Sequence, residues 1–143
     1  MLNRYWDDCD TPRDESHIMD VATAAASSRP AAEVYRNLRA GAESGWDFSS
    51  RWLADGRSLH TIRTVEIVPP DLNSLVHALE STLSEAYRLS GRDERADALL
   101  ARAQARADAI RRVLWNEELG AYADFLWRES RSTGQPTLAT VYP

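Results

Sequence analysis

The clearest hydrophobic pattern in the chain predicts a long amphipathic helix that starts at Pro70-Asp71. Its apolar residues recur at steps of three and four, which is the spacing of one helix face. Ser90-Gly91 closes the predicted helix, because glycine readily takes the left-handed conformation at a helix end. The apolar positions are Leu72, Leu75, Val76, Leu79, Leu83, Ala86 and Tyr87.

A second amphipathic helix is predicted from about Asp93 to residue 116. The connection between the two helices is only a few residues long, which favours an antiparallel pair. The alanine-rich face of the second helix permits it to approach the first helix closely. The apolar face comprises Ala96, Leu99, Leu100, Ala103, Ala107, Ile110, Val113 and Leu114, and the polar face comprises Arg95, Arg102, Arg106, Asp108 and Arg112.

The rest of the pattern is weaker. A helix is predicted from Ala31 to Glu43, opened by Pro30 and ended by Gly45. Residues 21–28 predict a short helix or a surface loop, residues 61–68 an extended segment, and residues 121–127 a short strand. Alanine and leucine are abundant and β-branched residues are few, so the fold class predicted is all-α, with irregular loops.

The composition of the chain argues against several classes of function. The chain has 143 residues and a net charge of −5, which argues against a dedicated nucleic-acid binder. No apolar run approaches the ~18 residues that a membrane span needs. The single Cys9 excludes an internal disulfide framework and a zinc site built from several cysteines.

An acidic group near the start of the chain, Asp7, Asp8 and Asp10, could ligate a divalent metal through its carboxylate oxygens. The alternative is a solvated loop in which the aspartates cap turns, and Pro12 favours that alternative because it argues against a helical presentation. We therefore expect no metal and no cofactor.

Asp47 is the most conspicuous candidate for chemistry, because Trp46 and Phe48 flank it and Trp52 follows closely. A carboxyl group among aromatic rings loses solvation, which favours the protonated form that a general acid needs. Aromatic rings also pack against the apolar faces of sugars, so the loop suits a carbohydrate site. The alternative is that Asp47 caps a turn at Ser49-Ser50.

Residues 42–52, AESGWDFSSRW, resemble a signature of the inverting α,α-trehalases, the glycoside hydrolases that split trehalose into two glucose molecules. The resemblance extends over essentially the whole chain. Further matching segments are RYWDD (residues 4–8), TPRDES (11–16), TIRT (61–64), IVP (67–69), DLNSL (71–75), LWN (114–116) and GAYAD (120–124).

The resemblance implies the chemistry and its residues. The family's general acid corresponds to Asp47, and Gly45 stands where a backbone group contacts the sugar. The family's sugar-binding Arg-Pro-Glu triplet corresponds to Arg13, Asp14 and Glu15, with Asp14 in place of proline. An inverting glycosidase also needs a second carboxylate as general base. In the family this base is a downstream Glu, which residues 1–143 do not include.

The resemblance further implies that the chain is part of an (α/α)6 toroid, residues 1–143 being a partial trehalase catalytic domain. Twelve helices with their connections need at least ~180 residues, so this chain cannot close the ring. We expect exposed apolar helix faces, low stability or association, and no hydrolysis by the chain alone. The implied partner is trehalose, and the implied parent is a bacterial protein, periplasmic rather than cytoplasmic. The alternative function is a non-catalytic helical binding module or a sugar-binding remnant.

Overall fold

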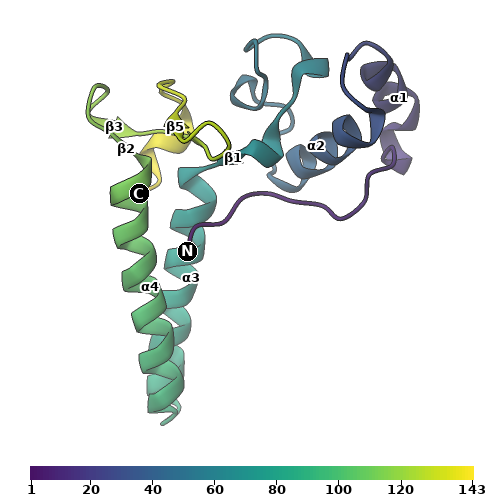
Figure 1. The fold of residues 1–143 in the computed structure, drawn as a ribbon. Helices are drawn as coiled ribbons and strands as arrows, with labels where there is room; N and C mark the ends of the chain where they lie inside the picture. The colour runs from purple at the N-terminus through teal and green to yellow at the C-terminus, as the bar shows by residue number, and fades with distance from the viewer. The chain divides into compact units, whose positions relative to one another are not determined.

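A computed structural model describes all 143 residues, which form two compact units. One unit comprises residues Arg4–Ile67, and the other comprises Met1–Asn3 with Val68–Pro143. Figure 1 shows the elements of both units. The chain is mostly helical, as its pattern predicts, and none of its helices is both long and apolar enough to cross a membrane.

The unit Arg4–Ile67 contains two α-helices and several short 3-10 turns. Helix α1 spans His17–Ala25, directly after a 3-10 turn at Asp14–Ser16, and α2 spans Ala31–Glu43. The predicted α2 is confirmed, with Pro30 as its N-cap, and the region predicted as helix or loop contains α1. Further 3-10 turns follow at Ser50–Trp52, Leu59–Thr61 and Thr64–Glu66.

The core of this unit forms where α2 meets the segment that follows it. Val34, Leu38 and Ile62 are fully buried, as is the Trp52 side chain. Asn37 is also fully buried, and its side-chain oxygen accepts a hydrogen bond from the Val65 N–H at 3.0 Å. The extended segment predicted for residues 61–68 is wrong for most of its length, because 3-10 turns occupy it and only Ile67–Val68 forms a strand, β1.

The second unit is built on the predicted antiparallel helix pair. Helix α3 spans Pro70–Leu89 and α4 spans Asp93–Leu114, and they lie side by side in Figure 1. Gly91 makes the tight turn between them with φ +73°. Pro70 is the first residue of α3, where the missing N–H of proline costs nothing.

The face that α3 buries is polar, contrary to the pattern. Asn73, Glu80 and Ser84 are buried, whereas Leu75 and Leu79 are 54% and 56% exposed. On α4 the prediction that Arg106 lies on the solvated face is also wrong, since it is 6% exposed. The helices approach closely through alanines at Ala96 and Ala103, and α3 packs on them with groups that hydrogen-bond. The expected exposed apolar face is present on α3.

Arg106 and Glu80 are the centre of the polar seam between the helices. Arg106 donates from Nε and Nη2 to the two carboxylate oxygens of Glu80, at 2.9 and 3.0 Å. Its Nη1 donates to the Met1 carbonyl and to the Asn3 side chain. Asn73 accepts from the Asn3 N–H and donates to the Asn3 carbonyl, so the first residues are tied to α3. The buried Arg106 and Glu80 side chains thus find their partners within one unit.

Small sheets follow α4. Strand β2 (Trp115–Asn116) pairs antiparallel with β3 (Ala121–Tyr122), with Trp115 opposite Tyr122. Strand β4 (Phe125–Leu126) pairs antiparallel with β5 (Arg131–Ser132), in a sheet of order β1-β4-β5. The single strand predicted for residues 121–127 is therefore two strands. A 3-10 turn at Leu138–Val141 lies near the end of the chain.

The stability of the helix pair is expected to fall with acid. The hydrogen bonds from Arg106 lower the pKa of Glu80 below its ordinary value of 4.5, although burial opposes this. Glu80 therefore stabilises the folded form above that pH, and the contribution is lost as the pH falls through the folded pKa. Urea unfolding between about pH 6 and pH 3 measures this loss. The Glu80→Gln chain should show a shallower dependence, and parallel curves would contradict the assignment.

Candidate functional site

The Asp47 loop begins where α2 ends. Gly45 takes φ +68°, a left-handed conformation that suits glycine, and it is exposed. Trp46 then donates its N–H to the Ser44 hydroxyl at 3.0 Å. The Asp47 carboxylate makes no hydrogen bond or ion pair with the protein. Ser49 caps the following turn by accepting from the Arg51 N–H, so the alternative of a capping Asp47 is wrong.

The expected desolvation of Asp47 is wrong too. Asp47 is exposed, because the rings on either side of it face other partners. The guanidinium carbon of Arg51 lies 5.3 Å from the Trp46 ring centroid and 4.0 Å from that of Trp52. The Trp52 indole also donates to the Trp46 carbonyl at 3.1 Å. The aromatic residues therefore hold the loop and leave its carboxylate open to a ligand.

Phe48 connects the Asp47 loop to α2 and to Arg13. A Cβ atom placed at Gly41 would lie 2.8 Å from the edge of the Phe48 ring, so the ring fits only because Gly41 has no side chain. The guanidinium carbon of Arg13 lies 5.1 Å from the centroid of the same ring, within the range of a cation–π contact. Phe48 directly follows Asp47, so this packing fixes the loop beside Arg13.

Arg13 is anchored by a residue that the sequence reading missed. Its Nε and Nη2 atoms donate to the two carboxylate oxygens of Asp20 at 3.0 and 2.8 Å. The Arg13 backbone N–H also donates to Asp20, at 2.9 Å. Asp20 is 1% exposed on the buried face of α1, with Ala24 one turn further along. Asp20 is the only acidic residue of α1. This isolated charge is the feature of the sequence by which its role could have been recognised.

The surroundings of the Arg13–Asp20 pair favour the ionised form of both side chains. Burial raises the pKa of Asp20, but the hydrogen bonds from Arg13 outweigh it and hold that pKa below the ordinary value. The same hydrogen bonds raise the pKa of Arg13, with smaller contributions from the charges of Glu15 and Asp47. Glu15 and Asp47 therefore each lie within electrostatic reach of Arg13.

Glu15 and its neighbour Asp14 stand on the 3-10 turn before α1, and both are exposed. They line a surface hollow of about 340 Å³ together with residues 16–19. Of the five predicted site residues, the structure thus brings Arg13, Glu15 and Asp47 into one region of this unit and leaves every carboxylate in the set exposed.

The aspartates of the first loop separate in the structure. Asp7 accepts from Arg39 at 3.1 Å and from the Cys9 N–H, and this backbone hydrogen bond is the main cause that lowers its pKa. Asp8 accepts from the Trp6 indole, and Asp10 pairs with Arg36. No three His, Cys, Asp or Glu side chains gather in a geometry that could hold a metal ion. These contacts agree with the alternative interpretation, in which the three aspartates belong to a loop and bond groups within it and beside it.

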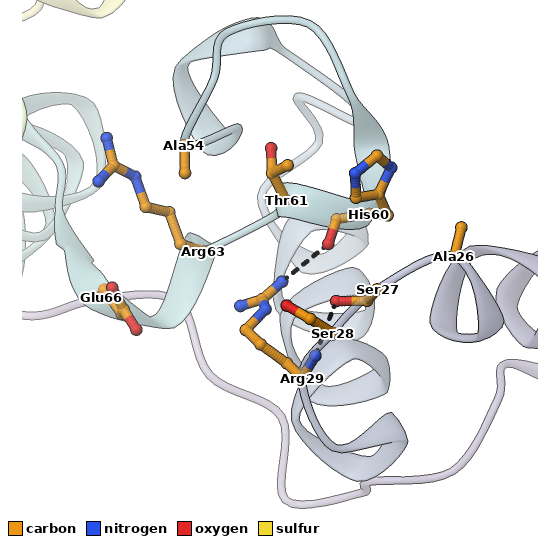
Figure 2. A pocket seen from close by; sticks show the side chains of 9 residues that line it. All are labelled: Ala26, Ser27, Ser28, Arg29, Ala54, His60, Thr61, Arg63 and Glu66. Atoms are coloured by element: carbon orange, nitrogen blue, oxygen red, sulfur yellow. Dashed lines mark hydrogen bonds between the residues drawn. The ribbon is translucent and has the colours of Figure 1, made fainter.

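A cavity of about 540 Å³ lies elsewhere in the same unit, between the α1–α2 connection and residues 54–66 (Figure 2). None of the five predicted site residues lines it. Arg29 is held there by the carbonyls of His60 and Ile62, at 3.2 and 2.6 Å. Figure 2 shows that the Arg63 and Glu66 side chains extend away from one another.

Gly41→Ala is expected to destabilise the unit Arg4–Ile67 although alanine favours helices. The helix propensity gained is at most ~1 kcal/mol. Overpacking costs ~1–3 kcal/mol, since the Phe48 ring that must move is also in contact with Arg13. Urea unfolding should show a net loss of up to about 2 kcal/mol. Ala32→Gly, at an exposed position of α2, measures the propensity contribution alone. A stabilised Gly41→Ala chain would contradict the close packing of Phe48.

Comparison with known proteins places these residues in a family. A family model described as Trehalase matches residues 1–143, the whole length of the chain. The chain belongs to the trehalase family. The resemblance in its sequence motifs is therefore confirmed at the level of the family.

Several curated relatives of this trehalase-family chain carry the name periplasmic trehalase. The protein from Xanthomonas campestris pv. campestris strain B100 is 55% identical over 144 residues, covering 100% of this chain and 25% of that protein. The proteins from Xanthomonas oryzae pv. oryzae strain MAFF 311018 and Xanthomonas axonopodis pv. citri strain 306 are each 54% identical with the same coverage. The chain spans about a quarter of the length of these relatives.

Proposed function

We propose that this chain supplies the general acid and part of the sugar-binding wall of an inverting α,α-trehalase. Asp47 is the proton donor to the glycosidic oxygen. Arg13 and Glu15 bind sugar hydroxyls, Asp14 stands at the edge of that wall, and Gly45 offers a backbone contact. One observation carries the proposal: within a chain that matches the trehalase family throughout, the Asp47 carboxylate is exposed and engaged by no protein group.

The chemistry assigned to each group follows from its type. A general acid must reach the leaving oxygen, which an exposed carboxylate on a fixed loop can do. A guanidinium presents paired donors in a plane, and these suit neighbouring oxygen atoms on a sugar. Inversion needs a second carboxylate ~6.5–9.5 Å from the first, with water between it and the anomeric carbon. The proposal assigns that general base to a Glu outside residues 1–143.

We also propose that the helix pair belongs to a larger (α/α)6 toroid. The support is the exposed apolar face of α3, where Leu75, Leu79 and Leu83 recur at every fourth position. A contiguous exposed apolar stripe of this kind marks a surface that packs against another element. Further helices of a toroid would cover it, and without them the chain is expected to associate or to have low stability.

The names of the relatives favour a periplasmic parent protein in a bacterium. Fractionation of the source cells, with detection by an antibody against residues 1–143, tests this proposal. Recovery of the antigen in the cytoplasmic fraction would contradict it.

A chimera tests the proposed function. Residues 1–143 replace the matching quarter of the X. campestris periplasmic trehalase, to which they are 55% identical. The chimera is expected to release glucose from trehalose, whereas the 143-residue chain alone is expected to release none. A chimera that melts cooperatively but releases no glucose would contradict the proposal. Calorimetric binding of trehalose without turnover would favour the sugar-binding remnant instead.

A further inference from the structure

Arg13 is held by two residues, Asp20 and Phe48, to which the proposed chemistry assigns no role. On its edge, Asp20 takes both Nε and Nη2 in a two-point contact, at 3.0 and 2.8 Å. The guanidinium carbon also lies over the Phe48 ring, 5.1 Å from its centroid. A guanidinium held by a two-point contact and by an aromatic ring keeps little freedom to rotate.

The carboxylate of Asp20 is itself fixed. Asp20 lies on the buried face of α1, is 1% exposed, and also accepts the backbone N–H of Arg13 at 2.9 Å. The Phe48 ring is fixed as well, because it packs into the space that Gly41 leaves on α2. Three segments of one unit therefore converge on a single guanidinium group.

The Arg13 side chain is 11% exposed, and its contact with Asp20 leaves some of the guanidinium donors without a protein partner. Nη1 donates to no protein atom, and Nη2 uses only one of its two N–H groups on Asp20. The remaining donors lie in one plane, on the side away from the Asp20 fork. They are the donors that a sugar with neighbouring oxygen atoms would use.

We propose that Asp20 and Phe48 form a preformed guanidinium seat, in which Asp20 is the positioning residue that aims the free donors of Arg13 at the sugar beside Asp47. The assignment of the sugar rests on the proposed function. The seat itself rests on the contacts within the unit Arg4–Ile67. Asp20 acts through Arg13 and touches no substrate.

A seat of this kind should accept a guanidinium that is not part of the chain. In the 143-residue Arg13→Ala chain, methylguanidinium is expected to raise the melting temperature in a saturable manner. The unmutated chain, whose seat is filled, should show no such rise, and neither should Arg13→Ala/Asp20→Asn. Methylammonium at equal ionic strength is the control ligand, because it has charge without a planar fork. Arg88→Ala is the matched control variant, since it empties an exposed pair with Asp97 of similar length, 2.7 Å.

The seat would be overturned by an Arg13→Ala chain that methylguanidinium does not stabilise, or that methylammonium stabilises equally. Equal stabilisation of the Asp20→Asn double variant would also overturn it. A second measurement needs no variant: the Nε–H proton of Arg13 should exchange with water much more slowly than that of Arg88 in nitrogen-15 spectra of the unmutated chain. Equal exchange would overturn the seat even if Arg13→Ala does not fold.

The positioning role is measured in the chimera. Asp20→Asn should lower kcat/KM for trehalose by about 100-fold, because a displaced binding group costs roughly that much. Methylguanidinium should restore part of the hydrolysis that Arg13→Ala loses, but none in Arg13→Ala/Asp20→Asn. Filling of the seat without any recovery of hydrolysis would contradict the proposed function of Arg13 and leave the seat standing. An unchanged kcat/KM in Asp20→Asn would overturn the positioning role.

Discussion

Asp47→Asn is expected to lower trehalose hydrolysis by the chimera by about 10²- to 10⁴-fold, the usual contribution of a general acid. The amide keeps the size of the side chain but has no acidic proton to give to the leaving oxygen. The loop should keep its conformation, because the Asp47 carboxylate bonds no protein group and the Phe48 ring is held by Gly41 and Arg13. Initial rates of glucose release measure the effect.

Asp97→Asn is the control for this variant. Asp97 is an exposed carboxylate of the same type, paired only with Arg88 on the surface of the helix pair. Its replacement should leave the rate of hydrolysis unchanged. If Asp47→Asn hydrolyses trehalose as fast as Asp97→Asn does, Asp47 is not the general acid.

Arg106→Ala is expected to destabilise the helix pair by ~3–5 kcal/mol, because it leaves the buried carboxylate of Glu80 without its main partner. The exposed Arg102, at 3.3 Å from Glu80, remains as a weaker partner. A loss of this size is a large part of the ~5–15 kcal/mol that stabilises an ordinary domain. Urea unfolding of the 143-residue chain, followed by circular dichroism, measures the loss.

Two variants separate the buried pair from the surface pair. Arg102→Ala removes the exposed partner and should cost less than ~1 kcal/mol. Glu80→Met/Arg106→Met removes both buried charges and should recover much of the loss, because no buried carboxylate is left unpaired. Equal losses in Arg102→Ala and Arg106→Ala would contradict the burial of the pair.

The sequence predicts the existence of the helices better than the faces they bury. Helical spacing and the glycines at positions 45 and 91 place α2, α3 and α4 within a residue or two. The same spacing assigns Leu75 and Leu79 to the core, although both are exposed. The spacing of apolar residues shows which of them share a helix face, but not whether that face is buried. Within these 143 residues α3 packs through Asn73, Glu80 and Ser84. Such a seam depends on partners far along the chain, which no local pattern contains.

The candidate site, like the helices, is predicted only in part by the sequence. Motif resemblance alone picks out Asp47, Gly45 and the triplet at residues 13–15, because these residue types recur in the family. Motif resemblance does not identify Asp20, because the role of Asp20 depends on its three-dimensional contact with Arg13. The aromatic context of Asp47 predicts desolvation, but ring orientation decides solvation. Phe48 is directed to Gly41 and Arg13 instead.

If Asp47 protonates the leaving sugar, the effect of its loss must depend on the leaving group. Hydrolysis of trehalose and of α-glucosyl fluoride is measured for the chimera with Asp47 and with Asp47→Asn. Fluoride departs as an anion and depends little on a proton donor. Asp47→Asn is expected to lose trehalose hydrolysis by orders of magnitude while retaining most of the fluoride release. An equal loss on both substrates, or a loss on neither, would contradict it.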